Sequence, residues 1–297
     1  MKATQLIVMA TVAMMAACST DNKDFDATGT FEATEVTVSA EQNGKLYSFD
    51  VTEGNKLNAN QQVGLIDTVQ LYLKAKQMGA TKDVYANQRP DTQKQIATTR
   101  QQLQTAEQEQ ARFAGLVKDG AANRKQLDDA TNAVKLLKRQ LYAQLSSLDN
   151  STRSLNSQMS AADIQRYEVL DQLDKCHIKS PITGTVLEKY TEQGEFATIG
   201  KPLFKIADTE NMFIRAYITT AQLQKVKIGQ QVKVMSDYGN GNRKTYNGTV
   251  TWISARSEFT PKTILTDDER ADLVYAIKVA IKNDGYIKIG MYGEVKF

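Results

Sequence analysis

The chain has 297 residues, of which 24% are charged and 41% are hydrophobic, an ordinary composition for a folded protein long enough to form two or three compact units. Its formal net charge is only +3, which is too small to indicate a surface for nucleic acid. Composition and charge therefore exclude nucleic acid from the expected partners.

The first residues have the pattern of an export signal. Residues 1–17 hold one lysine, small residues before Cys18, and an apolar run shorter than the roughly 20 residues of a membrane-spanning helix. Met15-Ala16-Ala17-Cys18 resembles the bacterial lipobox, which implies that Cys18 becomes the acylated first residue of the mature protein. A plain secretory signal with an incidental cysteine is the alternative. We therefore predict a signal peptide over 1–17, then a lipid-anchored linker and first strand over 18–36.

The second cysteine, Cys176, has no disulfide partner in the chain if Cys18 carries lipid. Cys176 precedes the apolar start of a strand, and we expect it to be a small buried side chain. The only histidine, His177, follows it. Adjacent side chains on a strand point to opposite faces, so these two residues are poorly placed to share a metal ion.

Two stretches of the chain repeat each other at a constant offset of 140 positions. Gly44 matches Gly184 and Gly54 matches Gly194, and apolar residues follow the same offset: Leu46/Val186, Val63/Leu203 and Ile66/Ile206. Glycine at a recurring turn supplies a positive φ or a close backbone approach. We expect residues 37–68 and 174–208 to be matched halves of one small β-domain, packed face to face.

The residues between the halves, 69–173, predict two long helices joined by a turn. Apolar and polar residues recur there in the alternating steps of three and four that form a coiled-coil seam. The predicted seam positions are Ile96, Thr99, Leu103, Ala106, Gln110, Phe113 and Val117, then Leu127, Ala130, Val134, Leu137, Leu141, Gln144, Leu148, Ser151, Leu155, Gln158, Ala162, Gln165, Val169 and Gln172. Gly120 can end the first helix and Asn123 can cap the second. The arms, 69–117 and 124–172, match in length, and each would span roughly 70 Å as a helix.

The first arm is less regular near its base, at Gly79 and at Arg89-Pro90. Proline disfavours helix for the residue before it and has no N–H to donate. We therefore predict a kink or a short break in this part of the first arm. The many Gln, Ser and Thr residues at seam positions predict an interface weaker than a leucine zipper, and hence a hairpin that bends.

A β-domain split by a helical hairpin resembles the biotinyl/lipoyl-domain halves of HlyD-like periplasmic adaptors, the membrane fusion protein family. The resemblance rests on Gly-x-hydrophobic followed by Glu/Gln-Gly in each half, and on Ser180-Pro181-x-x-Gly184 and Gly200-Lys201-Pro202-Leu203 in the second half. It implies a ring-like homo-oligomer around a transport axis. The rival is a lipoyl or biotin carrier, which presents a modifiable lysine on a tight hairpin between its halves. Here helix occupies that place, which disfavours the carrier.

The hairpin tip, 112–128, carries a more specific resemblance. Adaptors that dock a TolC-like outer-membrane channel carry Arg-Leu-x-x-Leu, Ala, Ser and Asp at set spacings around the turn. The residues at these spacings are Arg112, Phe113, Leu116, Ala121, Asn123 and Asp128. Phe113 departs from Leu but preserves bulk, and Asn123 departs from Ser but preserves a polar cap. The resemblance implies that these six residues dock a channel; the alternative is that solvated charges flank a simple turn.

Residues 209–297 predict a six-stranded β-barrel that ends in a membrane-proximal strand. The expected elements are strands at Met212–Ile218, Lys227–Val234, 246–255 and 272–282, and a short helix at Thr220–Val226. Leu223…Lys227-x-Gly229-Gln230-x-Val232 resembles the adaptor barrel, and Gly290-Met291-x-Gly293-x-Val295 its closing strand. Phe259-Thr-Pro-Lys262…Thr266…Arg270…Val274-Tyr275 is similar to the branch that works with ABC-type transporters; an ordinary loop is the alternative.

No pattern in the chain indicates catalysis, a metal site or a cofactor. The methionines form no cluster with His and Cys, no pair of carboxylates can be placed in one cavity, and no glycine-rich phosphate loop occurs. We therefore expect a protein that is not an enzyme and that has no cofactor.

Together these patterns predict a mixed, elongated, multidomain fold. It consists of a split biotinyl/lipoyl-like β-sandwich with an inserted long antiparallel α-helical coiled-coil hairpin, plus a C-terminal six-stranded β-barrel. The implied function is that of a lipid-anchored periplasmic adaptor, at the inner membrane of a bacterial envelope, that bridges an inner-membrane transporter, with an ABC type favoured, to a TolC-like channel. The alternative is an envelope lipoprotein scaffold without a transport role, whose coiled coil binds another helical protein.

Overall fold

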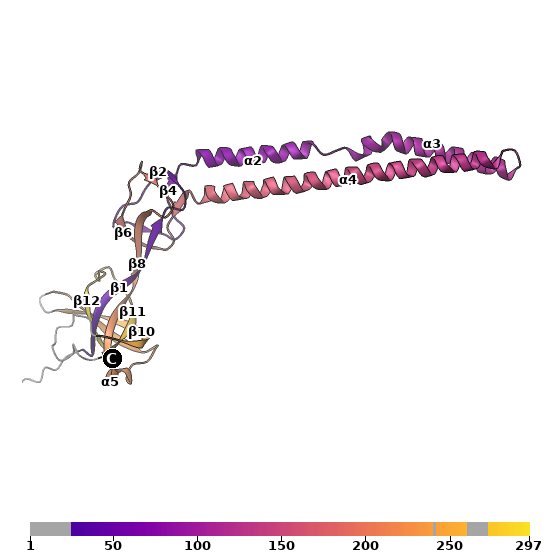
Figure 1. The fold of residues 1–297 in the computed structure, drawn as a ribbon. Coiled ribbons are helices and arrows are strands. Elements are labelled where there is room, and N and C mark those ends of the chain that lie inside the picture. Colours follow the sequence, from indigo (N-terminus) through magenta and orange to yellow (C-terminus); the bar gives the residue numbers. More distant parts are fainter. Residues whose placement is uncertain (1–24, 240–241, 260–272) are drawn as a thin grey trace, which may run out of the picture.

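The computed structural model describes residues 25–239, 242–259 and 273–297. The predicted signal peptide, Cys18 and most of the segment 259–270 lie outside the described residues. A β-barrel stands at one end of the molecule, a small sandwich follows it, and a helical hairpin projects from the sandwich (Figure 1). The mixed, elongated, multidomain fold predicted from the sequence is confirmed.

Three helices form the hairpin. They are α2 (Val69–Asn87), α3 (Thr92–Lys118) and α4 (Arg124–Asp174). Helix α4 is continuous and packs against α2 near the sandwich and against α3 near the tip (Figure 1). With 51 residues, α4 spans roughly 77 Å.

The first arm is interrupted at residues 88–91, between α2 and α3. Pro90 has no N–H to donate and disfavours helix at Arg89, so α2 ends at Asn87. Helix α3 then begins with Asp91 as its cap, whose side chain accepts a hydrogen bond from the Lys94 N–H at 3.2 Å. The break expected near Arg89-Pro90 is confirmed, whereas α2 runs through Gly79 without interruption.

The predicted seam holds at Ile96 and Leu103, which are buried, and is wrong at three positions of α4. The predicted residues Ser151, Gln158 and Gln165 are exposed, and the following residues Thr152, Met159 and Arg166 are half-buried instead. A seam position can lie either three or four residues after the previous one, and the order of these two spacings selects which residues face the partner helix. The residues at these positions are mostly polar, so their side chains do not show which order is correct. Packing against the first arm decides the order.

The two repeated halves form one sandwich around a shared core. Its short strands are β2 (Gly44–Phe49), β3 (Lys56–Leu57), β4 (Gln62–Ile66), β5 (His177–Lys179), β6 (Gly184–Lys189) and β7 (Phe196–Ala197). Backbone pairing joins the halves, because β2 pairs with β7, β3 with β6 and β4 with β5. Leu46 and Ile66 of the first half and their counterparts Val186 and Ile206 are buried in the same core.

The repeated glycines are required for two different physical reasons, each of which applies once in each half of the sandwich. A Cβ on Gly44 would lie 2.6 Å from the Ile66 Cγ2 atom, and a Cβ on Gly184 would lie 2.3 Å from the Ala207 carbonyl oxygen. Gly54 and Gly194 have φ values of +84° and +93°, a region that side chains disfavour. The first pair thus supplies close approach and the second supplies positive φ, in each half of the sandwich.

Six strands close into a barrel. They are β1 (Ala27–Ser39), β8 (Pro202–Thr219), β9 (Gln231–Asp237), β10 (Arg243–Phe259), β11 (Leu273–Lys282) and β12 (Tyr292–Lys296). The order β1-β12-β9-β10-β11-β8 returns to β1 through the β1–β8 pairing, so the sheet has no free edge there. Phe31, Ile214, Val234 and Ile277 are buried inside the barrel. The predicted six-stranded barrel is confirmed.

Two barrel elements differ from the prediction. The helix is shorter than expected, because α5 covers only Thr220–Leu223. Strand β9 begins at Gln231, and the preceding residues Lys227–Gln230 form a turn in which the Gln230 N–H donates to the Lys227 carbonyl at 3.1 Å. Gly229, with a φ of +88°, sets that turn and interrupts the alternating pattern.

Strands β1 and β8 belong to the barrel and the sandwich at once. Residues Thr28–Ala33 of β1 pair with β8 in the barrel, and residues Glu35–Ser39 pair with β8 in the sandwich. The register shifts between these segments, where Ala33 faces Met212 but Glu35 faces Ala207. The boundary expected between 208 and 209 therefore lies within a continuous strand that carries a bulge.

Cys176 is fully buried and its thiol donates to the Gln172 carbonyl at 3.4 Å. Burial raises the pKa of the Cys176 thiol, with a smaller contribution from the Asp67 carboxylate. The prediction of a small buried side chain is confirmed. Among the described residues, no helix is both long and apolar enough to span a membrane.

Candidate docking surface at the hairpin tip

The turn at the tip is closed by two capping arrangements. Gly120, with a φ of +72°, follows α3, and the Ala121 N–H donates to the Leu116 carbonyl at 2.8 Å while the Gly120 N–H donates to Val117. These two bonds are the Schellman arrangement. Asn123 caps α4 by accepting from the Lys125 N–H at 3.1 Å, and its own N–H donates to the Gln126 side chain at 3.2 Å. The expected roles of Gly120 and Asn123 in ending and starting the helices are confirmed.

The six residues of the tip motif lie together at the end of the hairpin but differ in exposure. Phe113 is half-buried at the seam, and Asn123, which is exposed, caps α4. Arg112, Leu116, Ala121 and Asp128 are exposed. The structure therefore divides the motif into two residues that shape the tip and four whose side chains are exposed there without a role in capping the helices.

Arg112 is held in place by its own helix. Its guanidinium forms an ion pair with Glu109 and lies over the Phe113 ring at 5.2 Å from the centroid. The Arg112 side chain is 62% exposed, and exposed pairs of this kind add at most about 1 kcal/mol to stability. The Arg112 side chain is thus held in one position by a weak ion pair. Exchanging Glu109 for another carboxylate would cost little free energy.

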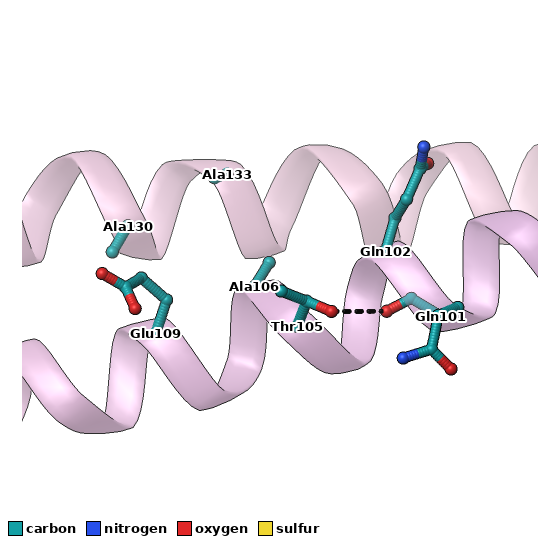
Figure 2. A pocket seen from close by; sticks show the side chains of 7 residues that line it. All are labelled: Gln101, Gln102, Thr105, Ala106, Glu109, Ala130 and Ala133. Atoms are coloured by element: carbon teal, nitrogen blue, oxygen red, sulfur yellow. Dashed lines mark hydrogen bonds between the residues drawn. The ribbon is translucent and has the colours of Figure 1, made fainter.

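A groove between α3 and α4 adjoins the tip (Figure 2). It is lined by Gln101, Gln102, Thr105, Ala106 and Glu109 of α3 and by Ala130 and Ala133 of α4. Ala106 and Ala130 reach into the space between the helices, and the Glu109 carboxylate that pairs with Arg112 lies at the tipward end of the groove. The tip surface therefore continues from the turn onto the side of the hairpin.

The groove was not predicted, although two of the small residues that line it are visible in the sequence as seam positions. Ala106 and Ala130 both occupy predicted seam positions. A pair of small residues leaves two helices without side chains to fill the space beside the seam, so the surface is hollow there. Only the register between the arms brings these alanines to the same level.

A family description matches the whole of the sandwich and the hairpin. The family "RND MFP, barrel-sandwich hybrid domain" matches residues 34–209, which is more than half of the chain. The chain belongs to the membrane fusion protein family. The predicted family is therefore confirmed.

Curated relatives share part of this membrane fusion protein. It is 34% identical over 119 residues to a UPF0194 membrane protein of Yersinia pseudotuberculosis, a match that covers 40% of this chain and 36% of the relative. A UPF0194 membrane protein of Salmonella arizonae is 32% identical over 119 residues, with 35% of that protein covered. The matched region thus spans about a third of the length of these relatives.

Solved structures share the fold of this membrane fusion protein. MacA of Actinobacillus actinomycetemcomitans aligns with a TM-score of 0.56 and 21% identity, over 91% of this chain and 76% of MacA. The membrane fusion protein Spr0693 of Streptococcus pneumoniae R6 aligns with a TM-score of 0.53 and 18% identity, over 91% of this chain and 97% of that chain. At these identities the likeness concerns the fold alone.

Proposed function

We propose that this membrane fusion protein is the periplasmic adaptor of an efflux or secretion system. In this proposal Cys18 carries a lipid that holds the chain at the inner membrane, the barrel end binds an inner-membrane transporter, and the hairpin tip docks a TolC-like outer-membrane channel. The adaptor works through geometry and supplies no chemistry, because the transporter provides the energy.

The tip is the observation that carries the proposal. Four motif residues, Arg112, Leu116, Ala121 and Asp128, are exposed at the far end of a hairpin whose helix α4 spans roughly 77 Å. An apolar Leu, a small Ala and two opposite charges suit the end of another helical assembly, because the small side chain permits close approach and the arginine and carboxylate can form charge-assisted hydrogen bonds. The alternative function, a scaffold without a channel partner, does not explain why these residue types occur together at the tip.

The transporter class rests on sequence alone. Phe259-Thr-Pro-Lys262…Thr266…Arg270…Val274-Tyr275 is similar to the branch of adaptors that works with ABC-type transporters, and we propose an ABC partner on that ground. Of this segment, Val274 and Tyr275 belong to β11 at the barrel end away from the sandwich, where Val274 pairs with Thr219. We expect a membrane-embedded partner to bind at that end, because it lies opposite the hairpin.

Two outward faces at the base of the hairpin support self-association. Val69, Leu73 and Val84 on α2 are between 52% and 57% exposed, and they fall within about 60° on a helical wheel. On α4, Ile164 and Tyr167 are 60% and 63% exposed. Helix α2 carries three lysines and one aspartate, whereas residues 160–174 of α4 carry four acidic residues and one arginine; of these, Lys82 and Asp163 already pair with each other within the chain at 2.8 Å.

Such a pair of unlike faces fits a head-to-tail contact, in which α2 of one copy packs on α4 of the next and repetition closes a ring. The Leu73→Asp variant is expected to raise the dissociation constant of the oligomer at least about tenfold, because a charge would enter an apolar contact. Analytical ultracentrifugation over a range of protein concentrations measures this constant. The control is Gln104→Asp, an equal charge change at an exposed position of α3. Equal behaviour of the two variants would place the contact elsewhere.

The proposed function is tested by isolating the full chain from crosslinked cells. The adaptor is expected to co-purify with both a multi-span ABC transporter and an outer-membrane channel, identified by mass spectrometry. The Cys18→Ser chain, which cannot be acylated, serves as the control for membrane placement. Recovery of neither partner after crosslinking would favour the scaffold alternative.

A further inference from the structure

The barrel end opposite the hairpin presents a tight turn with an apolar corner. Helix α5 lies at this end (Figure 1), and the chain continues from it through Lys227–Gln230 into β9. The Lys227 N–H donates to the Gln230 side chain at 3.0 Å, and the Gly229 N–H donates to the Val250 carbonyl at 2.8 Å. These bonds tie the turn to the barrel wall.

Ile228 occupies this turn and is 67% exposed, more than any other large hydrophobic residue among the described residues of 209–297. The neighbouring Val226 is only 4% exposed and anchors the loop in the barrel core. The turn itself needs a glycine for its positive φ at Gly229 but needs no apolar residue before it. Ile228 therefore contributes little to the barrel core.

The segment of sequence around Ile228 is cationic. Residues 220–236 contain Lys225, Lys227 and Lys233 and no acidic residue, and Lys225 and Lys227 are exposed beside Ile228. Lysine is depleted in the cores of protein interfaces. Exposed lysines next to an exposed aliphatic side chain suit a contact with an anionic membrane surface, where the cations bind headgroup phosphates and the apolar group enters the acyl boundary.

The chain places a membrane near this turn. The Gln222 side chain donates to the Asp26 carbonyl at 2.5 Å, so Asp26, which directly precedes β1, lies beside α5. Cys18 precedes Asp26 by eight positions, and eight extended residues reach at most about 28 Å. If Cys18 is acylated, as in the proposed function on which this step rests, the barrel end lies within that distance of the bilayer.

We propose that Lys225–Ile228 is a second membrane contact, in which Ile228 enters the interface of an anionic bilayer and Lys225 and Lys227 bind lipid phosphates. This contact fixes the tilt of the barrel relative to the membrane plane, which attachment through a single acylated residue leaves free. It thereby sets the direction in which the sandwich and the hairpin extend from the membrane.

The single tryptophan of the chain, Trp252, allows a direct test. The full chain with Trp252→Phe and Ile228→Trp is mixed with vesicles of phosphatidylethanolamine and phosphatidylglycerol that contain brominated acyl chains. We expect a blue shift and quenching of its fluorescence. The matched control is Phe196→Trp in the same background, a sandwich position that is 62% exposed in the present chain, and we expect no quenching there. Adding Lys225→Glu and Lys227→Glu should raise the lipid concentration for half-maximal quenching at least about tenfold.

The outcomes separate the membrane contact from the anchor. If the Ile228→Trp variant sediments with the vesicles but its fluorescence is not quenched, the proposed contact at 228 is wrong, whereas the lipid anchor is still supported. Failure of the chain to sediment with vesicles would overturn both. Equal quenching in phosphatidylcholine vesicles, or with both lysines reversed, would overturn the recognition of anionic lipid. Protection of the tryptophan at 228 only when the transporter is present would assign the turn to a protein partner and overturn the lipid contact.

Discussion

Reversal of charge at Arg112 is expected to separate the adaptor from the channel without separating it from the transporter. In the Arg112→Glu variant, recovery of the outer-membrane channel in crosslinked co-purification should fall at least about tenfold, because an exposed cation at the proposed contact becomes an anion facing the same partner surface. Export should fall with it. Asp128→Lys should act in the same direction, since Asp128 is the exposed anion of the same motif.

The control for this variant is Arg153→Glu. Arg153 is also exposed on the hairpin and pairs with Asp149 at 2.9 Å, as Arg112 pairs with Glu109. Loss of either pair changes stability by no more than about 1 kcal/mol, so folding does not distinguish the two variants. Circular dichroism verifies that both hairpins are intact. Wild-type channel recovery by Arg112→Glu and Asp128→Lys, or equal loss in Arg153→Glu, would contradict docking at the tip.

A methyl group at Gly184 is expected to destabilise the sandwich by about 3 kcal/mol. The added Cβ would lie 2.3 Å from the Ala207 carbonyl oxygen, which belongs to the paired strand β8. Backbone atoms cannot turn aside as a side chain can, so β6 and β8 would have to separate. Hydrogen exchange of the β6 amides, which includes the Val186 N–H bonded to the Asn55 carbonyl, measures the effect as roughly a hundredfold loss of protection.

The control for Gly184→Ala is Gly115→Ala in α3. A Cβ at Gly115 would meet no atom within 4 Å, and alanine favours a helix over glycine by up to about 1 kcal/mol. This variant is expected to be slightly more stable than the parent chain. A Gly184→Ala chain with unchanged β6 protection would show that the close approach of β6 and β8 is not a constraint on the fold.

The sequence repeat predicted the sandwich well because its signals are local. Gly54 and Gly194 mark turns through their own backbone conformation, and Gly44 and Gly184 mark places where neighbouring atoms approach closely. Leu46 and Val186 mark strand positions that face inward. Each of these residue types meets a local need of the backbone or the core, and that need is the same in both halves. A set of such residues that recurs at one constant offset therefore indicates that the same structure occurs twice. The ends of the hairpin were predictable for the same reason, through Gly120 and Asn123.

The candidate docking surface was only partly predictable. The spacing of the motif placed all six residues at the tip, but it did not distinguish the half-buried Phe113 from the exposed Leu116. The order of steps along α4 was also ambiguous, and the prediction was wrong at Ser151, Gln158 and Gln165. A helical repeat defines a stripe, whereas the exact face depends on which helix packs against it.

By itself, the sequence determined the sandwich halves, the lengths of the arms and the caps at the tip, because each depends on a few neighbouring residues. Only the tertiary structure decided that β1 and β8 cross from the barrel into the sandwich, which face of α4 packs against the first arm, and that Ala106 and Ala130 leave a groove beside the tip. These features depend on contacts between segments far apart in the chain, and the relative positions of such segments are set by packing, which no local pattern records.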